Sequence, residues 1–166
     1  HLGFAFKVMD IDERHRNVLI GINDEMEARW VNTMPFLAAQ YYLAQTNATP
    51  IKADENGVLS VGNTRYPMPS ETYADFGEAV SDASTQYIPY SHAGGISELG
   101  WFDVLDGKFD PAQLKGKLVV IGDNANLHLT SIKTGFGRHF FDIDDNIQPS
   151  TLNAFNADQL IGLSKY

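Results

Sequence analysis

The pentapeptide GDNAN, residues 122–126, has the chemistry of a polar ligand site. Asp123, Asn124 and Asn126 offer hydrogen-bond donors and acceptors within a short stretch. Gly122 lets the backbone turn sharply after the apolar run KLVVI that precedes it. The alternative interpretation is a turn in which the Asp and Asn side chains bind their own backbone. The spacing alone leaves both interpretations open.

A second group of candidate ligand contacts belongs to the stretch YIPYSHAGG, residues 87–95. Tyr90 and His92 stand close to the pair Gly94 and Gly95, and aromatic residues next to such a turn can close over a small molecule. The alternative is that these side chains pack in the core or form hydrogen bonds at the surface. With Thr134 of the stretch TGFG, the candidate ligand-binding residues are Tyr90, His92, Asp123, Asn124, Asn126 and Thr134.

The acidic stretch DIDDN, residues 142–146, resembles the first half of a calcium-binding loop. Asp142, Asp144 and Asn146 occupy alternate positions, as the first three oxygen ligands of such a loop do. The position that requires Gly is Ile147, and the position that requires a bidentate Glu is Asn153. We therefore expect a solvated acidic turn here, with no metal site and no cofactor in the chain.

The histidines raise the question of hydrolysis. His128 or His139 could act with Asp123 in a hydrolase of the bacterial envelope. The sequence contains neither the G-x-S-x-G turn of α/β-hydrolases nor the H-E-x-x-H motif of zinc proteases. We predict that the chain is not an enzyme, and an envelope hydrolase remains the alternative.

Length and composition set the limits for any function. The 166 residues suit one domain spanning residues 1–166. There are 21 acidic and 12 basic residues, and the net charge of −9 disfavours nucleic acid and anionic lipid as partners. The absence of Cys excludes disulfides and thiolate metal sites. No apolar run approaches the roughly 18–20 residues that span a bilayer, so we expect no membrane span in this chain.

The predicted helices and strands share clear start or stop signals. They are strands at residues 4–8 and 17–22, a largely buried helix capped by Asn32 or Thr33, a hairpin around Gly62 and Asn63, a short strand at residues 86–90, a helix capped by Ser97, a helical turn at residues 110–114 and a helix that Pro149 opens.

The run KLVVIG, residues 117–122, decides the predicted fold class. A continuous apolar run bounded by glycines is typical of a central parallel strand buried on both faces. Trp101 and Phe102, in the helix before it, are expected in the core. We predict an α/β fold with a mixed, mostly parallel central sheet and helices packed on its faces. Ligands bind beyond the carboxyl ends of such strands, where the GDNAN loop would lie.

The order of features from residue 87 onward resembles the CHASE2 domain, an extracytoplasmic sensory module of bacterial membrane receptors. The most specific part is the string DVLDGKFDPAQLKGKLVVIG, residues 103–122. Weaker likeness upstream is carried by HLGFAFKVMDID, MPFLAAQYYLA and NGVLSVGNTRYPM, so the resemblance extends over residues 1–161.

Some positions depart from the CHASE2 pattern. The opening strands of the family and its WPW-containing helix have no counterpart, so the chain is expected to lack the N-terminal part of the domain and to be a fragment of a larger receptor. Thr130 stands where an Asp is usual, Gly135 replaces a Pro, and LNAF replaces IHAN in the last helix.

The resemblance implies a non-catalytic sensor on the periplasmic side of a bacterial inner membrane. It would detect an unknown small-molecule or envelope signal and act as a homodimer through the full-length receptor. Flanking membrane helices would pass the signal to a cytoplasmic output domain, either a kinase, as in two-component systems, or a nucleotide cyclase. A structural dimerisation module without a ligand is the further alternative beside the envelope hydrolase.

Overall fold

The structure is a computed structural model, and structural statements refer to the residues that it describes. These are residues 17–24, 29–54, 57–66, 83–87, 96–122, 132–133, 146–147 and 149–165. The predicted strand at residues 4–8 lies outside these ranges.

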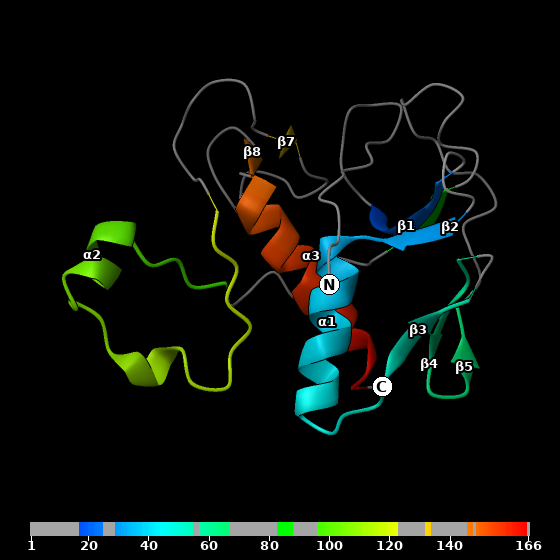
Figure 1. Cartoon of the computed structure of the whole chain (residues 1–166), viewed down its shortest axis with the longest axis horizontal. Coiled ribbons are helices and arrows are strands. Elements are labelled where there is room, and N and C mark those ends of the chain that lie inside the picture. The colour runs from blue at the N-terminus through cyan, green and yellow to red at the C-terminus, as the bar shows by residue number, and fades with distance from the viewer. Residues whose placement is uncertain are drawn as a thin grey trace.

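Three α-helices and eight short strands make up the described chain (Figure 1). The helices are α1 (Met34–Gln45), α2 (Trp101–Leu105) and α3 (Pro149–Leu163), with a 3-10 turn at Pro111–Gln113. The strands are β1 (Asn17–Asp24), β2 (Arg29–Asn32), β3 (Ile51–Ala53), β4 (Leu59–Val61), β5 (Thr64–Arg65), β6 (Ala83–Tyr87), β7 (Ile132–Lys133) and β8 (Asn146–Ile147).

The predicted mostly parallel central sheet is wrong for the described residues. Their strands form three small sheets, in the orders β2-β1-β6, β3-β4-β5 and β7-β8, and every pairing is antiparallel. Residues 117–122 belong to no strand, and the side chains of Val119 and Ile121 are 51% and 79% exposed. An apolar run shows only that its side chains favour burial, and it cannot show which strand will pair with it.

The sheet β2-β1-β6 is built around β1, which confirms the predicted strand at residues 17–22. Val18, Leu19 and Ile20 are buried, and a register irregularity lies between Leu19 and Gly21 in the pairing with β6. Gly21 allows close approach of β2. A Cβ added at this position would lie 2.5 Å from a ring carbon of Trp30. The indole nitrogen of that tryptophan donates a 2.7 Å hydrogen bond to Asn32 Oδ1.

The sheet β3-β4-β5 contains the predicted hairpin. Val61 pairs with Thr64 across the turn at Gly62 and Asn63, and Gly62 has a φ of +57°. This left-handed conformation is the one in which Gly is favoured over other residues. Leu59 and Val61 point into the core from β4 because alternate residues of a strand lie on the same face.

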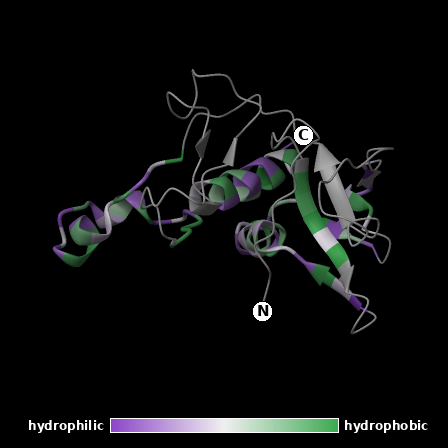
Figure 2. Cartoon of the chain, turned by 90° about the horizontal axis from the view of Figure 1, so that it is seen from above, coloured by the Kyte–Doolittle hydropathy of each residue, from purple (hydrophilic) through white to green (hydrophobic). Residues whose placement is uncertain are grey.

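The core lies where α1 and α3 pack on each other and on the two three-stranded sheets. Its largest fully buried members come from five elements: Ile20 of β1, Phe36 and Leu43 of α1, Ile51 of β3, Leu59 of β4, and Leu160 of α3. Figure 2, at right angles to Figure 1, shows α1 nearly end-on beside α3, with β1 and β2 on one side of the helix pair. The predicted helix at α1 is confirmed, although Tyr41 is 65% exposed and not in the core.

The segment of residues 96–122, which we call the arm, extends from the other side of the helix pair (Figures 1 and 2). It contains α2 at its far end and the 3-10 turn that confirms the predicted helical turn. The predicted cap at Ser97 is wrong, because α2 begins at Trp101 and its N-cap is Gly100. Trp101 and Phe102 are 59% and 78% exposed, so their predicted core positions are wrong as well.

Candidate functional site

The sequence-predicted ligand residues lie outside the part of the chain that the structure describes. This holds for all six candidates, and for the two histidines of the hydrolase alternative: Tyr90, His92, Asp123, Asn124, Asn126, Thr134, His128 and His139. The structure does describe the elements that lead into and out of these segments, and these flanking elements determine where each segment starts and ends in the chain.

The segment of residues 123–131 connects two described elements. It follows Gly122, the last residue of the arm, and it ends at Ile132, the first residue of β7.

The pair β7-β8 closes the segment of residues 134–145. Ile132 pairs with Ile147, and Lys133 pairs with Asn146. The chain therefore leaves this sheet directly before Thr134 and returns to it at Asn146, the last residue of the acidic stretch that resembles a calcium loop. The sequence did not predict this pairing, because strands of two residues carry no alternation of apolar and polar side chains to detect.

A single residue separates β8 from α3. Ile147 ends β8, and Pro149 begins the helix, with Gln148 between them. Proline suits this position because the first turn of a helix does not use its backbone N–H groups. Leu152, Phe155 and Leu160 of α3 are buried, and α3 packs on α1. The end of the candidate segment is thus joined to the helix at the centre of the core.

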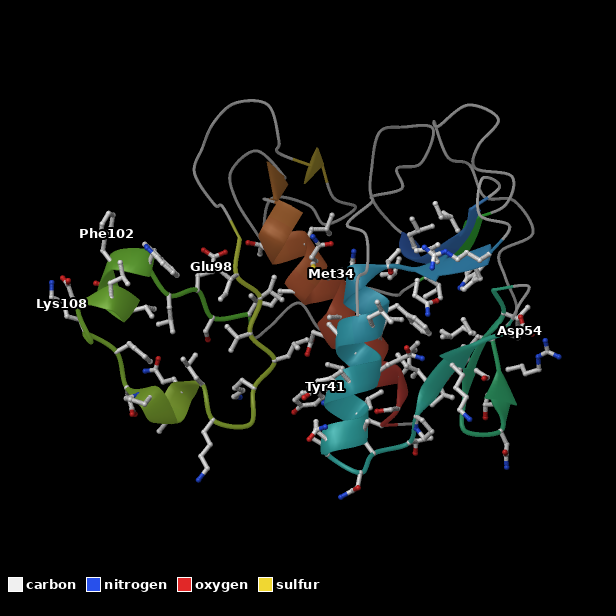
Figure 3. All side chains as sticks on the ribbon, in the orientation of Figure 1. Met34, Tyr41, Asp54, Glu98, Phe102 and Lys108 are labelled. Atoms are coloured by element: carbon white, nitrogen blue, oxygen red, sulfur yellow. The ribbon has the colours of Figure 1, made fainter. Side chains whose placement is uncertain are left out.

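The arm is joined to the helix pair at both of its ends. Thr151 Oγ1 of α3 donates a 2.8 Å hydrogen bond to Glu98 Oε1, and the Tyr42 hydroxyl of α1 donates a 3.3 Å hydrogen bond to the carbonyl oxygen of Gly116. Leu118 packs against the core cluster. Figure 3 labels Glu98 near the helices, and Phe102 and Lys108 at the far end of the arm. Gly116 and Leu118, which lie six and four residues before Gly122, are thereby held to the helix pair and the core.

Two ion pairs at the surface involve described residues. Arg65 lies 2.8 Å from Asp54, and Lys108 lies 2.7 Å from Asp106. Pairs in such positions contribute little to stability. No group of three or more His, Asp or Glu residues in the described ranges could hold a metal ion. Within those ranges no helix has the length and apolar character needed to cross a bilayer.

Comparison with models of protein families, with curated proteins and with solved structures gives no significant match. The likeness to the CHASE2 domain therefore rests on the sequence stretches quoted above.

Proposed function

We propose that this chain is a non-catalytic, extracytoplasmic sensor domain of a bacterial membrane receptor. The proposal is supported by the likeness of residues 103–122 to the CHASE2 domain. The signal is a small molecule or another component of the cell envelope, and the candidate contacts are the six polar and aromatic residues named above. The domain passes the signal through flanking membrane helices to a cytoplasmic kinase or nucleotide cyclase.

The connection of residues 134–145 to α3 is the observation that carries this proposal. Residues 134–145 start and end on the pair β7-β8, and Gln148 alone connects that pair to α3. A ligand that binds one arrangement of the segments more tightly shifts the population toward it. Because β8 and α3 are nearly continuous, such a shift changes the position of α3 relative to α1.

A thermal-shift screen tests the proposal on the full chain. The library contains amino acids, sugars, nucleotides, small organic acids and divalent cations. A ligand that binds only the folded state raises the melting temperature as its concentration increases. We expect a saturable rise from one chemical class, and we expect Asp123→Ala to remove it without lowering the melting temperature of the free protein.

Asp158→Ala is the matched control for this substitution. Asp158 is an exposed carboxylate of α3. It has the same charge as Asp123 and lies far from it in the sequence. The control variant should show the full ligand-induced rise. A response that survives in Asp123→Ala places the site elsewhere, and a library without any response contradicts the sensor proposal.

A further inference from the structure

Exposed apolar side chains are concentrated on the arm. Six of the seven large hydrophobic residues that are exposed in the described ranges belong to it, the seventh being Tyr41 of α1; the six are Leu99, Trp101, Phe102, Leu105, Val119 and Ile121. Figure 2 shows the far end of the arm lying away from the helix pair and the sheets, and Figure 3 places Phe102 at this far end. A group of aromatic and aliphatic side chains at this level of exposure marks an interaction surface.

The residue types of the arm suit an interface. A stable interface of standard size needs about 800 Å² from each partner. The exposed Trp and Phe are also among the residue types that are enriched at interfaces.

The charge distribution favours a second copy of the chain as the partner. The arm holds four of the 21 acidic and three of the 12 basic residues, so it carries −1 of the net charge of −9. Contact between two arms therefore produces little repulsion between copies. The acidic remainder of the chain disfavours an anionic membrane at the same face.

The run of residues 118–121 offers backbone groups as well as side chains. It is rich in β-branched residues, and its backbone has no hydrogen bond to another residue of the described ranges. Such a segment is a template for pairing with another chain. The same run in a second copy is an apolar partner of equal length, and antiparallel pairing of the two is compatible with two-fold symmetry.

We propose that the arm is a homodimer interface, in which the apolar surface and residues 118–121 of one copy contact the same features of a second copy. This interface does not depend on the proposed sensor function. The dimer forms without ligand, and its loss is measured separately from ligand binding.

Sedimentation of the full chain at increasing concentration tests this interface. We expect a monomer–dimer equilibrium for the wild type and a rise of at least about tenfold in the dissociation constant for Phe102→Ser. Tyr41→Ser is the matched control, because it removes an exposed aromatic side chain outside the arm. It should leave the dissociation constant unchanged. Far-UV circular dichroism checks that each variant is folded, and Ile121→Ser replaces Phe102→Ser if that variant does not fold.

Three results would overturn the proposal. They are a wild type that stays monomeric at all concentrations, a dimer that neither Phe102→Ser nor Ile121→Ser weakens, and a dimer that Tyr41→Ser weakens as much as the arm variants do. Since the chain has no Cys, single cysteines give a second measurement. Ile121→Cys should form a crosslinked dimer with a short bismaleimide reagent, and Tyr41→Cys should not.

Discussion

Thr33 connects the first helix to the strand that precedes it. The residue is fully buried, and its hydroxyl donates hydrogen bonds of 2.7 Å and 3.2 Å to the carbonyl oxygens of Leu19 and Ile20. Its backbone N–H also binds the Ile20 oxygen, at 2.9 Å. The side chain therefore binds the irregular part of β1 and makes no capping bond to the helix itself.

Thr33→Val removes these hydroxyl bonds while keeping the shape of the side chain. The Leu19 carbonyl then loses a buried partner, and we expect the free energy of unfolding to fall by about 1–3 kcal/mol. Urea denaturation of the full chain measures the change. Thr33→Ser, which keeps the hydroxyl, should recover most of the loss.

Thr46→Val is the control at the other end of the same helix. The Thr46 hydroxyl binds the Tyr42 carbonyl at 3.0 Å in an exposed position. Because water can replace this bond, the free energy of unfolding should change by less than about 0.5 kcal/mol. Equal losses of unfolding free energy in Thr33→Val and Thr46→Val would show that the buried hydrogen bonds to β1 contribute no more stability than the exposed bond does.

Residue types predict local roles better than long-range partners. Asn32 or Thr33 is predicted as the cap from residue type and from Pro35 in the following turn, and Thr33 occupies the N-cap position without a capping bond from its side chain. The partner of its hydroxyl lies 14 residues away. No local pattern contains that information, because the contact exists only after β1 and α1 have packed together.

Replacing Gly21 or Gly162 by Ala is expected to change the free energy of unfolding in opposite directions. In β1, a Cβ at Gly21 would lie 2.5 Å from the Trp30 ring and 2.7 Å from the Val31 carbonyl oxygen. Since backbone as well as side chain would have to shift, Gly21→Ala should lower the free energy of unfolding by about 1–3 kcal/mol.

Gly162 of α3 is the matched position. No atom lies within 4 Å of a Cβ added there, and the residue is helical. Because Ala loses less backbone entropy than Gly in a helix, Gly162→Ala should raise the free energy of unfolding by up to about 1 kcal/mol. Chemical denaturation of both variants compares the two effects. A destabilised Gly162→Ala variant would mean that α3 has a neighbour at this position.

Elements with strong local signals could be predicted, and elements that depend on pairing could not. The helix α1, the hairpin at Gly62 and Asn63, and the start of α3 at Pro149 all follow from propensity and turn chemistry. The run at residues 117–122 has the composition of a central strand, but strand pairing is a tertiary interaction. The predicted parallel sheet failed at this point.

The helix pair formed by α1 and α3 lies between the arm and the two three-stranded sheets (Figures 1 and 2). The segments of residues 123–131 and 134–145, which hold four of the six candidate ligand residues, follow the arm in the chain and precede β8, next to α3. The sequence could name polar residues for a ligand, but the direct connection to α3 required the pairing of β7 with β8. In the proposed sensor mechanism, α3 is the element that responds to the ligand.

Hydrogen exchange of the α3 amides tests whether this helix responds to ligand binding. The full chain is measured with and without the strongest ligand of the thermal-shift screen, alongside Asp123→Ala. We predict that saturating ligand changes the exchange rates of residues 149–163 in the wild type and leaves them unchanged in the variant. Ligand binding that alters exchange elsewhere but nowhere in α3 would contradict the account, because the site would then have no connection to the helix proposed to carry its signal.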